Sequence, residues 1–136
     1  LSNSDIFFTL NLLHIKHFFR DKKHKALCIS RHEFHKKYSN LKKCRLIHNA
    51  HTGRSHDAWI FHSEKLPDPN NKYYSQTNFQ LGLYACDNRI AYLLHAMGFH
   101  LKNPARLIKI YHYHTSNYRT WNSKKPVKGL YKFVPV

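Results

Sequence analysis

Residues 81–119 carry the strongest pattern in the chain and read LGLYACDNRIAYLLHAMGFHLKNPARLIKIYHYHTSNYR. After Asp87, apolar residues recur at three- and four-residue steps from Ile90 to Met97, which predicts a helix with one apolar face. Gly98 stands where a helix commonly ends. The acidic residue therefore lies at the start of the clearest helix in the chain.

A strand is predicted shortly after this helix. Asn103 and Pro104 form a turn signal, and residues 107–114 then read as a strand. Alternation along it puts four residues on one face: Ile108, Ile110, His112 and His114. We therefore expect a carboxylate at a helix start and two imidazoles at a strand end to meet in one cleft.

Elsewhere the chain alternates short strand and helix patterns, which favours the α/β fold class. Strands are predicted within residues 4–8, 26–30 and 57–61. A helix is predicted over residues 10–19, with an apolar stripe through Leu10, Leu13 and Phe18. The chain divides into one domain over residues 1–121 and a basic tail over residues 122–136. We expect the tail to be loosely held, or to pack only through Leu130, Tyr131 and Phe133.

Composition limits the class of protein. The chain has 136 residues, of which 42% are hydrophobic and 15% aromatic, so it suits a single globular domain rather than a disordered segment. No apolar run approaches the ~18 residues that a membrane span needs. The three cysteines lack a Cys-x-x-Cys pair, so we expect reduced thiols and a cytoplasmic location.

The charge is strongly unbalanced, with 23 Lys and Arg against 7 Asp and Glu, which gives a net charge of +16. Such a field attracts polyanions, including nucleic acid, nucleotides and anionic lipid. The basic residues are spread along the chain, as in a solvated basic surface, although a nucleic-acid face is the alternative. In so basic a chain, an acid beside a patterned segment is expected to pair with a cation or to bind a metal. Asp5, Asp57 and Asp87 are such acids.

Four segments suggest a family. They are NSDI at residues 3–6, ALCISR at 26–31, SHDAWIF at 55–61, and CDNRIAY at 86–92 followed by HxHxSxxR at 112–119. In this order they resemble a group of bacterial and viral glycosyltransferase-like proteins with a nucleotide-sugar-transferase fold of the GT-A type. The resemblance covers roughly residues 1–121. It implies transfer of a sugar from a nucleotide-sugar donor to an acceptor that the sequence does not identify.

The resemblance also implies a metal site. In such folds an acid at a strand end holds a divalent metal against the donor diphosphate, and Asp5 matches that position. A histidine near the carboxyl-terminal end often completes the metal shell, and His112 or His114 would do so here. Oxygen ligands suit Mg²⁺ or Mn²⁺, and the metal would neutralise charge on the leaving diphosphate.

The remaining implied roles concern the acceptor and the phosphates. A later carboxylate binds the acceptor or acts as a base, for which Asp87 is the first choice and Asp57 the second. Arg89 and Arg119 would pair with phosphates, because a guanidinium presents a planar fork of donors. The amino-terminal half of the family's fold has no counterpart here, so we expect a partial sheet with flanking helices, from a truncated or degenerate transferase.

Plainer interpretations stay open beside these. Asp87 can serve only as a helix N-cap, Asp57 can pair with Arg54 or a helix end, and the two histidines can be surface residues. A non-enzymatic module that binds nucleic acid or another polyanion is the main alternative function, supported by charge and interleaved aromatic residues. A metal-dependent nuclease built on the HxH pair would need a further acid near the histidines, and none is close in sequence.

Overall fold

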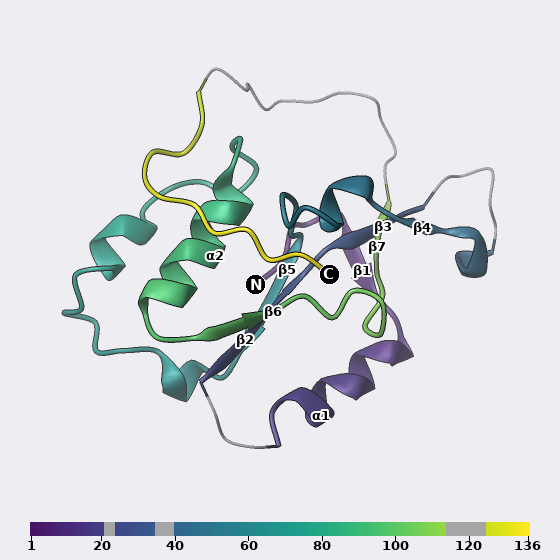
Figure 1. Cartoon of the computed structure of the whole chain (residues 1–136), viewed down its shortest axis with the longest axis horizontal. Helices are drawn as coiled ribbons and strands as arrows, with labels where there is room; N and C mark the ends of the chain where they lie inside the picture. The colour runs from purple at the N-terminus through teal and green to yellow at the C-terminus, as the bar shows by residue number, and fades with distance from the viewer. Residues whose placement is uncertain (21–23, 35–39, 114–124) are drawn as a thin grey trace.

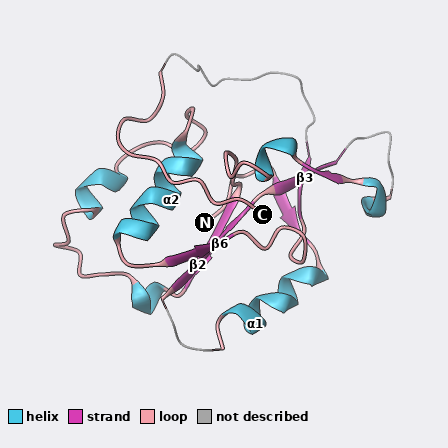
Figure 2. Ribbon diagram, in the orientation of Figure 1, coloured by secondary structure: helices cyan, strands magenta, loops and turns pink. Residues whose placement is uncertain are grey.

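The computed structural model describes residues 1–20, 24–34, 40–113 and 125–136 (Figure 1). The fold is mixed α/β, with two small sheets and few helices (Figure 2). The predicted strands at residues 4–8, 26–30 and 57–61 are confirmed as β1 (Ile6–Phe8), β2 (Lys25–Ile29) and β5 (Ala58–Phe61). The prediction of an α/β class is therefore correct at this level.

The first sheet has three strands in the order β5-β2-β6, with β6 at His100–Lys102. Strand β5 is antiparallel to β2, and β6 is parallel to it. The central strand β2 is buried from Ala26 to Ile29, as expected for an apolar run with neighbours on both sides. Strand β2 could be predicted from sequence because its short apolar run is flanked by charged residues.

The second sheet has four strands in the order β1-β7-β3-β4. Strand β7 is Ile110–Tyr113, β3 is Arg31–Phe34 and β4 is Arg45–Leu46. Only Ser30 separates β2 from β3, so the chain passes directly from one sheet to the other. Asn103 fixes this crossing, because its side chain accepts a hydrogen bond from the Ser30 N–H and donates one to the Ser30 hydroxyl.

Helix α2 (Cys86–Ala96) packs its apolar face on the three-stranded sheet. Ile90, Ala91 and Leu94 join a buried cluster with Trp59 of β5 and Phe99. The predicted end of the helix is confirmed, since Gly98 follows it with φ of +92°. The start differs slightly: the helix begins at Cys86, so Asp87 lies in its first turn rather than at the N-cap.

The helix expected over residues 10–19 is shorter than predicted and buries other residues. A 3-10 turn over Leu10–His14 leads into α1 (Ile15–Phe18). Leu10 and Leu13 are 84% and 68% exposed, so the predicted stripe through them is wrong. A 3-10 turn has three residues per turn and an α-helix has 3.6, so different side chains face the protein interior than a continuous helix would place there. Four of them pack against a second buried cluster, which includes Leu27, Ile29 and Ile110: Leu12, Ile15, Phe18 and Phe19.

Four further 3-10 turns connect these elements: η2 (Leu41–Lys43), η3 (His48–Ala50), η4 (Ser63–Lys65) and η5 (Tyr74–Thr77). In the described part of the chain, no helix has the length and apolar character that crossing a bilayer requires.

The carboxyl-terminal segment, residues 125–136, packs closely against the domain. In Figure 1 it runs beside α2 and ends over the strands. The Lys132 N–H donates to the Asn88 carbonyl, and the Val134 N–H donates to the Gly53 carbonyl. Val127 and Val134 are buried, whereas Leu130 and Phe133 are 64% and 50% exposed. The expectation of a tail that packs only through Leu130, Tyr131 and Phe133 is therefore wrong, because main-chain bonds and two valines hold it.

Candidate functional site

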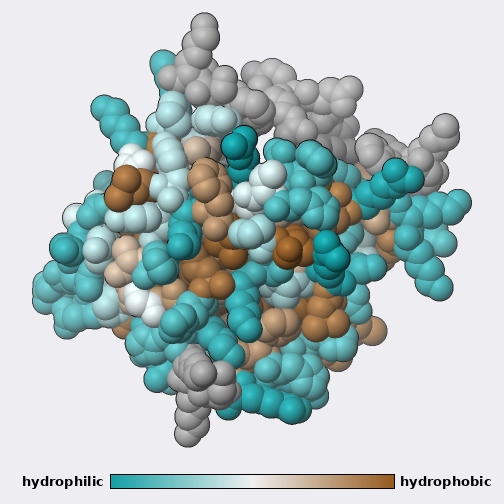
Figure 3. Space-filling view, in the orientation of Figure 1, coloured by the Kyte–Doolittle hydropathy of each residue, from teal (hydrophilic) through white to brown (hydrophobic). Residues whose placement is uncertain are grey.

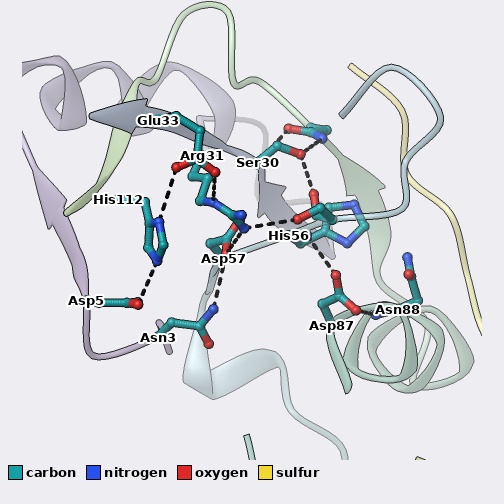
Figure 4. Close-up of polar contacts among 12 residues, drawn as sticks. Asn3, Asp5, Ser30, Arg31, Glu33, His56, Asp57, Asp87, Asn88 and His112 are labelled. Carbon is teal, nitrogen blue, oxygen red and sulfur yellow. Dashed lines mark hydrogen bonds and ion pairs between the residues drawn. The ribbon is translucent and has the colours of Figure 1, made fainter. Parts of the chain in front are cut away.

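A row of polar side chains crosses the four-stranded sheet and begins with Asp5 and His112 (Figure 4). The Nε2 atom of His112 lies 2.6 Å from Oδ2 of Asp5, and its Nδ1 atom lies 3.3 Å from Oε2 of Glu33. The imidazole is buried, whereas the Asp5 side chain is 43% exposed. One histidine is thus held between two carboxylates, one of which is open to solvent.

The strand register explains this arrangement. In the antiparallel pair of β1 and β7, Ile6 lies opposite His112, and Asp5 reaches the imidazole from the turn just before β1. In the parallel pair of β3 and β7, Glu33 lies opposite His112. Side chains at opposed positions of neighbouring strands share a face of the sheet. Strand β3 therefore places Glu33 on the same face as His112, whereas Asp5 approaches the imidazole from outside the strand.

The cluster shifts the pKa values of its members. The hydrogen bond from His112, together with Arg31, outweighs burial and lowers the pKa of Glu33 from 4.5 to about 2. Burial alone would lower the pKa of His112, but the hydrogen bonds to Glu33 and Asp5 outweigh it and raise that pKa above 6.5. The protonated imidazole and its carboxylates therefore stabilise each other.

Arg31 extends the row to Asp57. Its Nε atom lies 2.8 Å from Oε1 of Glu33, and its Nη1 atom lies 2.8 Å from Oδ1 of Asp57. Asn3 donates to the same Asp57 oxygen at 3.2 Å. Asp57 is 3% exposed, and its Oδ2 atom has no hydrogen-bond partner among the described residues. Burial raises the pKa of Asp57 despite the guanidinium beside it.

Asp87 lies at the far end of the row, beside His56. Its Oδ2 atom accepts a hydrogen bond from the His56 main chain at 3.2 Å, and its Oδ1 atom accepts one from the Asn88 main chain at 2.9 Å. Burial raises the pKa of Asp87 from 3.8 to about 6, and the nearby charge of Asp57 adds to the rise. A carboxyl group that titrates near neutrality is suited to acid–base chemistry.

The structure thus brings several predicted residues into one region. Asp5 and His112 are in direct contact, and Asp57 connects them through Arg31 and Glu33 to the neighbourhood of Asp87 (Figure 4). His114 and Arg119, the other predicted metal and phosphate residues, lie outside the described residues.

Arg89 lies apart from this row and binds the chain itself. Its guanidinium donates to the Leu130 carbonyl at 3.1 Å and to the Gln76 side chain at 2.7 Å, and it stacks over Tyr92. The alternative pairing of Asp57 with Arg54 or a helix end is not what the structure shows, because Arg31 is the partner.

Glu33 and Arg31 are the members that sequence reasoning missed. Both lie in a polar stretch with no clear periodicity, and only their two-residue spacing places them on one face of a strand. Glu33 is 79 residues from His112 in sequence, so its role depends on the parallel pairing of β3 and β7. An acid that is distant in sequence therefore lies beside His112 in space.

The donors at Asp5 and His112 suit a divalent metal in part. Within the described residues, no group of three potential ligands comes together. The two donors present are a solvent-open carboxylate and an imidazole nitrogen whose ring is oriented by Glu33 on its other side, as in many carboxylate–histidine–metal sites. Mg²⁺ commonly takes one or two protein carboxylates together with substrate phosphates. Two such donors leave most of the coordination shell of a divalent metal to other ligands.

Comparison with known proteins adds no family to this description: no family model matches the chain, and neither a curated protein nor a solved structure does so.

Proposed function

We propose that this chain is a glycosyltransferase-like domain that transfers a sugar from a nucleotide-sugar donor to an acceptor. The observation that carries the proposal is the contact of Asp5 with His112. The two residues are 107 positions apart in sequence, and the family resemblance predicted that both belong to one metal site. A GT-A type arrangement, of which this chain would be a partial form, belongs to the same proposal.

In this proposal Asp5 and His112 hold Mn²⁺ or Mg²⁺ together with oxygens of the donor diphosphate. The bound metal would supply charge neutralisation on the leaving diphosphate. Metal binding requires the neutral imidazole, so the proton on Nε2 would have to leave, while Glu33 continues to orient the ring through Nδ1. His114 remains the proposed third ligand.

The acceptor side is assigned to Asp87. Its pKa of about 6 leaves the carboxylate ionised at neutral pH and still basic enough to accept a proton from an acceptor hydroxyl. Asp57 is almost fully buried and bound to Arg31, so it acts as a positioning residue in this proposal. Arg119 remains a proposed phosphate ligand, and Arg89 could take that role only by exchanging its bonds to Leu130 and Gln76.

A thermal-shift titration tests the donor site. Mn²⁺ and UDP or GDP are added singly and together to the native chain and to Asp5→Asn. We expect the melting temperature to rise more with metal and nucleotide together than with either alone, because each completes the binding site of the other, and we expect Asp5→Asn to lose that additional rise. A ligand at 100 times its Kd stabilises a protein by about 2.7 kcal/mol, which is several degrees for a domain of this size.

Asp68→Asn is the matched control, since Asp68 is exposed in a loop and makes only a local contact with the Asn70 main chain. It should keep the combined shift. A rise that is the same with and without metal, in the native chain and in Asp5→Asn, would contradict the metal-assisted donor site, and so would no rise at all.

The net charge of +16 favours a second candidate function, which is binding of nucleic acid or another polyanion without catalysis. The positions of the charges support it. In the row from Asp5 to Asp57, the three carboxylates pair with one arginine and one histidine, Arg31 and His112. Since the chain has 23 Lys and Arg against 7 Asp and Glu, most of its cations exceed the available carboxylates, and this surplus attracts an anionic partner. Loss of binding with rising salt is its test.

A further inference from the structure

A pocket of about 600 Å³ lies beside β6, on a different sheet from the row of Asp5 and His112. Strand β6 is at an edge of the three-stranded sheet, and the carboxyl-terminal segment forms the opposite wall. This volume is in the range of small-molecule sites in proteins. On the face shown in Figure 3, hydrophobic residues reach the surface in the middle and hydrophilic residues surround them.

The lining of the pocket is basic. Lys102 and Lys132 supply two fixed positive charges, and His95 and His100 add two imidazoles. None of the acids in the described part of the chain contributes to the lining, and neither lysine takes part in a recorded ion pair. Positive charges that line one pocket, with no acid among its lining residues, favour an anion there.

The pocket also offers a flat apolar surface. Phe133 lines it and is 50% exposed, and Pro135 lies next to it along the wall. The guanidinium of Arg54 lies 5.9 Å from the centre of the Phe133 ring. An exposed aromatic ring among cations is the combination with which proteins stack a nucleobase while they hold its phosphates.

The wall and floor are fixed in place by buried bonds. The side chain of Asn103 donates to the Val134 carbonyl at 3.0 Å and to the Ser30 hydroxyl at 2.9 Å. Nε2 of His56 lies 3.1 Å from the same Val134 carbonyl. The segment that carries Lys132 and Phe133 is therefore held at a set position relative to β6, which reduces the ordering cost of binding.

We propose that this pocket binds the phosphate of a nucleotide, with Lys102 and Lys132 as its charge partners and Phe133 as the stacking surface for the base. The inference rests on polyanion binding, the second candidate function proposed above, and it assigns that binding to a specific site. The same chemistry is presented by a free nucleotide and by a nucleotide unit of single-stranded nucleic acid.

Binding of ADP, pyrophosphate and a short single-stranded oligothymidylate is measured by calorimetry on the full chain, with EDTA present so that no metal-dependent donor site contributes. Lys102→Glu/Lys132→Glu is compared with Lys42→Glu/Lys43→Glu, which makes the same change of charge at two exposed lysines of η2. We expect the pocket variant to weaken binding about tenfold or more and the control pair to change it far less. If both pairs of substitutions weakened binding equally, the chain would bind polyanions through its overall charge, and the proposal that the pocket is the binding site would be wrong.

Phe133→Ala separates the base from the phosphate. It should weaken binding of ADP and the oligonucleotide about tenfold and leave pyrophosphate unchanged, whereas equal effects on all three would overturn the stacking role. Binding of ADP identifies a free nucleotide as the source, binding of the oligonucleotide alone identifies a single strand, and failure of both refutes the proposal.

Discussion

At the scale of single residues, two buried groups oppose each other as pH changes. Burial lowers the pKa of His56 from 6.5 to about 4, and its Nδ1 atom has no hydrogen-bond partner among the described residues. A histidine whose pKa falls on folding costs stability as pH drops below 6.5, because the unfolded chain takes up the proton first. Burial raises the pKa of Asp87 from 3.8 to about 6, so its cost grows as pH rises over nearly the same range.

Because the two shifts oppose each other, we expect His56 and Asp87 together to cause little change in the free energy of unfolding with pH. Substituting either residue alone should expose the pH dependence that the other one causes. His56→Gln should keep a donor for the Val134 carbonyl and gain about 3 kcal/mol in the free energy of unfolding, relative to the native chain, between pH 6.5 and pH 4. Asp87→Asn should gain a similar amount from pH 4 to pH 6. Urea unfolding at several pH values measures both differences, and parallel pH profiles for variant and native chain would contradict the assignment.

At the scale of elements, the carboxyl-terminal segment and helix α2 act as one unit. The Asn88 side chain donates to the carbonyls of Gly53 at 2.8 Å and Lys132 at 3.1 Å, so one residue of the helix joins a loop and the segment. Gly129 lies so close to Arg89 that an added Cβ would be 2.5 Å from its Cζ atom. The segment therefore passes directly against the Arg89 guanidinium of α2 at Gly129.

Gly53→Ala is expected to detach this segment. Gly53 has φ of +69°, and an added Cβ would lie 2.7 Å from the main-chain nitrogen of Pro135, a contact that only main-chain movement can relieve. We expect a loss of about 2–4 kcal/mol in the free energy of unfolding and faster proteolysis after residue 125. Gly82→Ala is the control, because φ there is +86° but no atom lies within 4 Å of the added methyl. Equal losses in the two variants would show that strain alone, rather than the contact, is responsible.

At the scale of the whole molecule, the charge of +16 dominates. Self-repulsion destabilises the compact state, and salt screens it over a Debye length of about 10 Å at 0.1 M. We therefore expect the melting temperature to rise with NaCl while affinity for a polyanion falls steeply. Lys42→Glu/Lys43→Glu, which lowers the charge by four units, should show a smaller rise. A melting temperature that does not respond to salt would contradict this account.

The sequence by itself determined the elements whose periodicity is strong. Helix α2 with its terminal Gly98, and the strands β1, β2 and β5, follow from local spacing because a helix face or a buried apolar run leaves its pattern in consecutive residues. It also marked Asp5, Asp57 and Asp87, since acids are scarce in this basic chain, and it marked His112 by the alternation of the predicted strand.

Only the tertiary structure decided which partners these residues have. Glu33 and Arg31 join the site through the parallel pairing of β3 with β7 and the crossing of the chain at Ser30, and Arg89 binds the carboxyl-terminal segment because that segment packs on α2. Such contacts join residues tens of positions apart, so no local pattern encodes them. The burial that raises the pKa of Asp87 and lowers that of His56 likewise arises only when the sheets and α2 come together.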